Sequence, residues 1–265
     1  MCPQCIERAV NKGSFMKEQL YTIPVNEAFE TEDECPFCFM ERDVEQRAIR
    51  YVAGPAATYM EPDVRAATGR VGFCTHHMKS LFDYGNHLGA AMMLQTHLTS
   101  VLDEIKGKAD VTSIPAKKSL FRKKEVSEET PYWKTLSLRS DACYICDKIE
   151  YNMSRRFHTF FALLKEPEFR EKVLNCKGFC VRHFARLLQE AESYLPDSQR
   201  EWFYTTVYSL MCDNMERVKN DLDWFVAKYD YRNASAPWGN SKDALPRAMQ
   251  KLQGLYPNDP PYKEK

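Results

Sequence analysis

The sequence lacks any excess of charge, because 37 basic side chains balance 37 acidic ones. No global field therefore attracts the chain to nucleic acid or to an anionic membrane. It also lacks an apolar run approaching the roughly 20 residues that a membrane-spanning helix needs. The first residues have neither the basic start nor the apolar middle of a signal peptide. These absences predict no nucleic-acid partner, no membrane partner and a cytoplasmic location.

Common catalytic motifs are missing as well. The chain contains no phosphate-binding glycine-rich loop, no Gly-x-Ser-x-Gly elbow and no His-Glu-x-x-His helix. Whether the protein is an enzyme is therefore left open by its motifs.

Cysteine, by contrast, is abundant, with ten residues in the chain. A reducing compartment disfavours structural disulfides, so repeated Cys-x-x-Cys pairs indicate metal binding or redox chemistry. A Cys-x-x-Cys pair followed by Gly-Phe-Cys-x-x-His occurs twice. The first copy contains Cys35, Cys38, Cys74 and His77, and the second contains Cys143, Cys146, Cys180 and His183.

Each copy supplies three thiols and one imidazole, a ligand set that suits tetrahedral zinc. Two residues three apart at a helix start can point toward one ion. We therefore predict that each copy forms its own Cys3His site, with two zinc ions in total. An iron–sulfur cluster is the alternative, since cysteine with occasional histidine also holds such clusters. A site filled by four protein ligands is structural rather than catalytic.

Apolar residues at helical spacing predict an all-α protein, a helical bundle built from two pseudo-repeats that each carry a Cys3His metal clamp. The predicted divisions are an N-terminal extension (1–15), a first helical metal-binding repeat (16–106), a linker (107–131), a second repeat (132–230) and a C-terminal tail with a short helix (231–265). Cys2 and Cys5 form a further Cys-x-x-Cys pair within the extension.

Local sequence patterns predict individual elements. Residues 21–25 read as extended because Pro24 restricts the residue before it. One long helix is expected from Cys74 to about Lys106, and another from about Asp197 to Tyr229; together they should supply most of the core. The apolar stripe of the first comprises Met78, Leu81, Leu88, Met92, Leu98, Leu102 and Ile105. Ser241 is a candidate cap for the last short helix.

The first copy has histidines that the second lacks. His76 precedes the ligand histidine where the second copy has Arg182, and His87 and His97 follow in the same predicted helix. We regard His76, His87 and His97 as candidate cofactor-binding residues. Cys176, beside Cys180, is a candidate for thiol exchange with a metal ligand.

Five segments resemble an uncharacterised bacterial, cytoplasmic family of unknown function. They are residues 21–26 (YTIPVN), 35–38 (CPFC), 60–65 (MEPDVR), 72–74 (GFC) and 243–247 (DALPR). The resemblance covers about residues 16–255 and implies no established activity.

Three functions are compatible with these patterns. The first is a zinc-containing scaffold that binds an unknown protein or small-molecule partner. The second is a redox or cofactor-dependent enzyme with an iron–sulfur or other metal centre in the first repeat. The third is a metal or redox sensor. The oligomeric state is not indicated.

Overall fold

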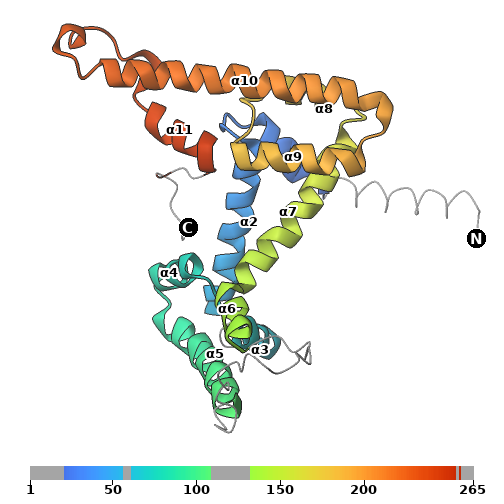
Figure 1. The fold of residues 1–265 in the computed structure, drawn as a ribbon, viewed down its shortest axis with the longest axis vertical. Helices are drawn as coiled ribbons and strands as arrows, with labels where there is room; N and C mark the ends of the chain where they lie inside the picture. The colour runs from blue at the N-terminus through green and yellow to red at the C-terminus, as the bar shows by residue number, and fades with distance from the viewer. Residues whose placement is uncertain (1–20, 56–60, 109–131, 255–256, 258–265) are drawn as a thin grey trace, which may run out of the picture. The chain divides into compact units, whose positions relative to one another are not determined.

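The computed structural model describes residues 21–55, 61–108, 132–254 and 257. Within these ranges the chain is helical and contains no strand, so the predicted all-α class is confirmed (Figure 1). The helices are residues 21–30, α2 (Pro36–Ala53), α3 (Pro62–Val71), α4 (Thr75–Asp83), α5 (His87–Lys108), α6 (Tyr132–Asp141), α7 (Tyr144–Leu163), α8 (Pro167–Asn175), α9 (Val181–Tyr194), α10 (Asp197–Ala227) and α11 (Ala244–Gln253). The 3-10 turns η3 (Tyr231–Asn233) and η4 (Gly239–Ser241) precede α11.

The chain forms two compact units. Of the described residues, unit 1 contains 21–44 and 151–254, and unit 2 contains 45–55, 61–108 and 132–150. The divisions fall within α2 and α7. They differ from the repeat boundaries predicted from the sequence, which stay a prediction. The Cys2/Cys5 pair, the predicted extension and most of the predicted linker lie outside the described residues.

Unit 1 is built around stacked phenylalanines. Phe37 of α2 lies face to face with Phe157 of α7, with ring centroids 4.2 Å apart. Phe29 stacks on Phe160 at 5.5 Å and meets Phe169 of α8 edge-on at 5.2 Å. Each buried aromatic ring removes a large apolar area from water, and such ring pairs contribute beyond their area. Helices from distant parts of the sequence are thereby fixed against one another.

The first helix of unit 1 corrects one expectation. Residues 21–30 are helical, not extended. Val25, Ala28 and Phe29 are buried at helical spacing against this core. Their burial outweighs the local restriction that Pro24 places on its neighbour.

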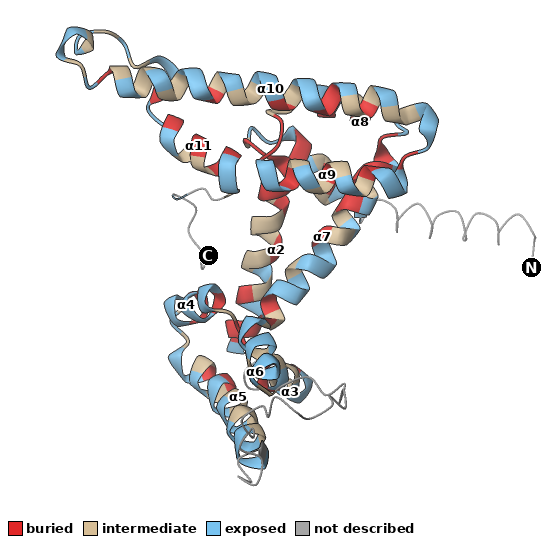
Figure 2. Ribbon diagram, viewed as in Figure 1, coloured by how far each residue is buried: buried red, intermediate tan, exposed pale blue. Residues whose placement is uncertain are grey.

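Unit 2 has a smaller core and a long exposed helix. Phe73, Leu81 and Met93 are buried, and α5 packs against α3 and α4. The single long helix predicted after Cys74 is wrong, because the chain breaks between α4 and α5 where Gly85 adopts φ 91°. Because of this break, the residues of the predicted stripe do not lie on one face of a single helix. Leu81 is the only fully buried member of the stripe, whereas Met78, Leu88, Leu98, Leu102 and Ile105 are exposed. Figure 2 shows that much of α5 is exposed or half-buried.

The other predicted long helix forms over nearly the expected residues, but most of the buried phenylalanines of unit 1 lie in other helices. Helix α10 spans Asp197–Ala227 and buries Phe203, Val207, Met211 and Val218. It packs against α9 and α11 within unit 1. Ser241 does not cap α11; its hydroxyl donates to the carbonyl of Trp238 at 2.7 Å, and Asp243 holds the cap position.

None of the helices in the described residues combines the length and hydrophobicity that a membrane crossing requires.

Candidate metal centres

The eight predicted ligands gather into two groups of four. Cluster 1, in unit 1, consists of Cys35, Cys38, Cys180 and His183. All four residues are buried, and none is more than 3% exposed. The Nδ1 atom of His183 lies 3.5, 3.4 and 3.3 Å from the sulfurs of Cys35, Cys38 and Cys180, and the last two sulfurs are 3.5 Å apart.

Cluster 2, in unit 2, consists of Cys74, His77, Cys143 and Cys146. The Nδ1 atom of His77 lies 3.3, 3.3 and 3.4 Å from the sulfurs of Cys74, Cys143 and Cys146. The sulfurs of Cys74 and Cys146 are 3.8 Å apart. Cys143 and His77 are buried, but Cys74 is half-buried and Cys146 is exposed.

The predicted grouping of these ligands is wrong, although the ligands themselves come together. Each Cys-x-x-Cys pair meets the Cys-x-x-His of the other copy, not of its own. Backbone contacts in unit 2 accompany this exchange. The N–H of Tyr144, at the start of α7, donates to the carbonyl of Gly72 at 3.0 Å. The packing of the helix starts therefore decides which Cys-x-x-Cys pair meets which Cys-x-x-His pair.

The glycine before each Phe-Cys turn has a structural reason. Gly72 and Gly178 adopt φ of 80° and 78°, a region that favours glycine. A Cβ at Gly72 would lie 2.5 Å from the ring of His97, and one at Gly178 would lie 3.0 Å from the carbonyl oxygen of Leu210. These turns bring Cys74 and Cys180 to the positions directly before α4 and α9.

The ligand cysteines lie at helix starts, where the helix dipole favours thiolate. Cys74 and Cys180 are the N-cap residues of α4 and α9, and Cys180 accepts the backbone N–H of His183 at 3.4 Å. Cys35 and Cys143 immediately precede α2 and α7. Each helix start thus points two ligands in one direction.

The distances fit one tetrahedral ion in each cluster. Bonds of about 2.3 Å to sulfur and about 2.1 Å to nitrogen place two sulfurs about 3.8 Å apart and a sulfur and nitrogen about 3.5 Å apart. The measured separations are 3.5 and 3.8 Å for sulfur pairs and 3.3 to 3.5 Å for sulfur–nitrogen pairs. Each cluster could therefore hold a metal ion.

The three thiols of cluster 1 differ in pKa. Hydrogen bonds from Cys35 and Cys38 hold the pKa of Cys180 far below that of a free thiol. Burial raises the pKa of Cys35, and the hydrogen bond with Cys180 raises that of Cys38. Only one thiol of the three ionises readily, since adjacent thiolates repel in a buried site. A bound divalent cation would offset two of the three negative charges and so allow all three thiols to bind as thiolates.

Two glutamates of α2 contact the ligand histidines from behind. Glu45 lies 3.2 Å from Nε2 of His77 and 2.7 Å from Nε2 of His76. Glu41 lies 3.6 Å from Nε2 of His183 and pairs with the guanidinium of Arg182. A carboxylate behind a ligating histidine orients its ring and raises its basicity. Sequence reasoning missed both glutamates.

The position of Glu45 behind His77 also gives His76 a hydrogen-bond partner. His76 and Arg182 occupy equivalent positions, and each bonds the glutamate that approaches the neighbouring ligand histidine. His97 instead bonds the carbonyl of Gly69 at 2.9 Å, and exposed His87 lies beside the ring of Phe82. Among the described residues, His87 and His97 join no cluster of metal-ligating side chains. Their predicted cofactor role stays a prediction.

Cys176 belongs to neither cluster within the described part of the chain. Burial raises the pKa of its thiol to about 11.

Helix α11 fastens the backbone on both sides of cluster 1. Lys251 is 1% exposed; its ammonium group donates to the carbonyl of Glu34 at 2.7 Å and to the carbonyl of Lys177. It also pairs with the buried Glu34 carboxylate at 3.2 Å. One side chain thus connects the residue before Cys35 with the turn before Cys180.

Lys251→Met should destabilise unit 1 strongly. The substitution keeps the apolar stem but leaves Glu34 with a buried charge supported mainly by Arg217, 2.6 Å away. Removing one partner of a buried ion pair costs roughly 3 kcal/mol or more. Chemical denaturation measures the loss. Lys219→Met, which removes an exposed pair with Asp223, is the matched control and should unfold at nearly the wild-type midpoint. Equal midpoints for both variants would contradict the fastening role.

The chain is thus an all-helical protein with two clusters, each of three cysteines and one histidine, that could hold a metal ion. It belongs to a family of unknown function, DUF6062, whose model matches residues 16–259. No curated protein matches the sequence, and no solved structure does.

Proposed function

We propose that the two clusters are structural zinc sites and that the protein is a non-enzymatic helical scaffold for a protein or small-molecule partner. The observation that carries the proposal is the closed ligand shell. In each cluster four protein atoms converge at tetrahedral separations, so no position is left for a substrate or a reactive water. Such a site contributes folding free energy by joining helices that are far apart in the sequence.

Zinc is preferred over an iron–sulfur cluster on geometric grounds. The ligands of an iron–sulfur cluster surround several iron and sulfide atoms, which spreads them apart. Here the four ligand atoms of each cluster lie within 4.8 Å of one another, which suits a single ion. The Cys3His composition is also common in structural zinc sites.

The eight described cysteines form no disulfide. Free thiols with metal-ligand spacing suit a reducing compartment, so we assign the protein to the cytoplasm.

Metal analysis of paired variants tests the proposal and the exchanged grouping together. Anaerobically purified wild type should be colourless and contain about two zinc ions per chain. Cys38→Ser/Cys180→Ser removes two ligands of one cluster and should retain about one ion. Cys38→Ser/Cys74→Ser damages both clusters and should retain none. Grouping within each copy would reverse these two results. Visible absorption from iron in the wild type would overturn the zinc assignment.

A further inference from the structure

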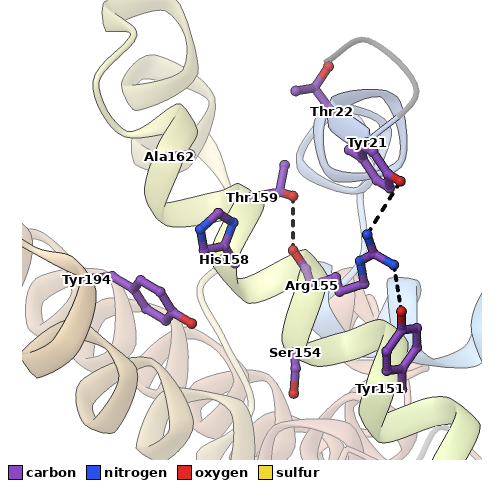
Figure 3. A pocket seen from close by; sticks show the side chains of 9 residues that line it. All are labelled: Tyr21, Thr22, Tyr151, Ser154, Arg155, His158, Thr159, Ala162 and Tyr194. Carbon is purple, nitrogen blue, oxygen red and sulfur yellow. Dashed lines mark hydrogen bonds between the residues drawn. The ribbon is translucent and has the colours of Figure 1, made fainter. Parts of the chain in front are cut away.

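Unit 1 contains a cleft that is separate from both clusters (Figure 3). Its volume is about 700 Å³, within the range of small-molecule sites. The exposed side of α7 forms its floor, the 21–30 helix forms one wall, and Tyr194 at the end of α9 forms the other. The lining residues are Tyr21, Thr22, Tyr151, Ser154, Arg155, His158, Thr159, Ala162 and Tyr194.

Arg155 is the charged group of this cleft. Its guanidinium donates to the hydroxyl of Tyr151 at 2.8 Å and more weakly to that of Tyr21 at 3.4 Å. It also lies 5.1 and 5.4 Å from the centroids of these two rings. Figure 3 shows the guanidinium reaching between the two phenols. Two of its five N–H donors are thereby engaged, which leaves others for a ligand.

The charge of Arg155 is not neutralised by protein groups in the described part of the chain. No carboxylate pairs with it there, and none lines the cleft. Neighbouring arginines differ: Arg156 lies 3.4 Å from Asp43, and Arg186 lies 3.0 Å from Glu190. A guanidinium held in place by aromatic rings and lacking a counter-ion favours an incoming carboxylate or phosphate.

Aromatic rings form the second part of the cleft. His158 meets Tyr194 edge-on, with ring centroids 5.3 Å apart. Tyr194 in turn stacks on buried Phe161 at 5.5 Å, which fixes its ring to the core. His158 follows Arg155 by three residues on α7, so the two side chains start about 5 Å apart along the helix surface. The small side chain of Ala162 leaves space above them.

We propose that this cleft binds a small planar organic anion, with its phosphate or carboxylate on Arg155 and its aromatic ring against His158 and Tyr194. The dimensions suit a ring and an anionic group separated by roughly one helical turn, as in a nucleoside monophosphate or an aromatic acid. The cleft supplies a ligand class for the scaffold, so this inference rests on the proposed function.

Isothermal titration of the full-length, zinc-loaded protein tests the cleft with AMP and with indole-3-acetate. At least one of these probes should bind, and more tightly than adenosine or inorganic phosphate alone. Arg155→Gln should weaken that binding by about tenfold or more, because it removes a charge-assisted contact. Arg156→Gln is the matched control, since Arg156 already pairs with Asp43; it should bind as the wild type does.

Three results would overturn the proposal that the cleft binds a planar organic anion. They are no binding of either probe by zinc-loaded wild type, equal affinity of Arg155→Gln and wild type, and equal affinity for a probe and for phosphate alone. Because the zinc content is measured on the same samples, failure of the cleft is distinguished from failure of the zinc sites.

Discussion

Cys143→Ser is expected to unfold unit 2 while unit 1 stays folded. Unit 2 buries few large side chains, and α5 leaves Leu88 and Leu98 more than half exposed. Helix α6 buries no residue and is held to α5 through Arg139, which bonds Glu104 and Ser100. Metal binding is folding free energy in domains with small cores; in zinc-finger peptides it is worth on the order of 10 kcal/mol. Loss of cluster 2 should remove most of the stability of this unit.

Hydrogen exchange measured by mass spectrometry resolves the two units. In Cys143→Ser, amides of residues 61–108 should lose nearly all protection, whereas those of residues 157–218 should keep theirs. The second range contributes to the phenylalanine core and to cluster 1, which both remain intact. Cys212→Ser provides the control, because Cys212 is an exposed thiol on α10 outside both clusters. Unchanged protection in residues 61–108 would contradict a metal-dependent unit 2.

A thiol reagent is expected to release the two zinc ions in separate phases. Cys146 is an exposed residue and Cys74 is half-buried, so N-ethylmaleimide can reach cluster 2 directly. The three cysteines of cluster 1 are buried. Gly254, at the end of α11, covers Cys38 so closely that a Cβ there would lie 3.3 Å from its sulfur. Reaction in cluster 1 therefore requires local opening, which slows it by about tenfold or more.

A chromogenic zinc indicator follows this release. The wild type should yield one equivalent rapidly and the second slowly. Cys38→Ser, which lacks cluster 1, should keep the fast phase, and Cys143→Ser should lose it. Release of both equivalents from the wild type at one rate would show that burial does not protect cluster 1.

The eight residues that the spacing of cysteine and histidine singled out do come together in two clusters, since two residues three apart at a helix start share a direction. It could not predict the grouping. A Cys-x-x-Cys pair could join the Cys-x-x-His pair of its own copy or that of the other copy, and both arrangements satisfy the local spacing. The choice depends on which helix starts pack together. The two glutamates did leave a signal: Glu41 and Glu45 follow Cys38 by three and seven residues, on one face of α2.

The failures in secondary structure have a similar origin. Apolar periodicity predicted the α5 stripe as core, but periodicity shows only that a helix has an apolar side. It does not show that another element covers that side. The prediction for residues 21–25 failed in the opposite way, because distant phenylalanines supplied the burial that local propensity did not anticipate. The long helix predicted from about Asp197 does bury part of its surface, because α9 and α11 pack against α10.

Each cluster closes a loop of the chain, and the exchanged grouping places the loop closed by cluster 2 inside the loop closed by cluster 1. Cys74 and Cys146 are 72 residues apart and lie within the 142 residues that separate Cys38 from Cys180. During synthesis from the N-terminus, the inner closure can be completed while the partners of Cys35 and Cys38 are not yet made. These two thiols, although earliest in the pattern, must wait for the longer closure, with its larger entropic cost. The buried site is thus the last to assemble, and a ribosome-bound chain that has exposed Cys146 but not yet Cys180 should carry one metal ion rather than two.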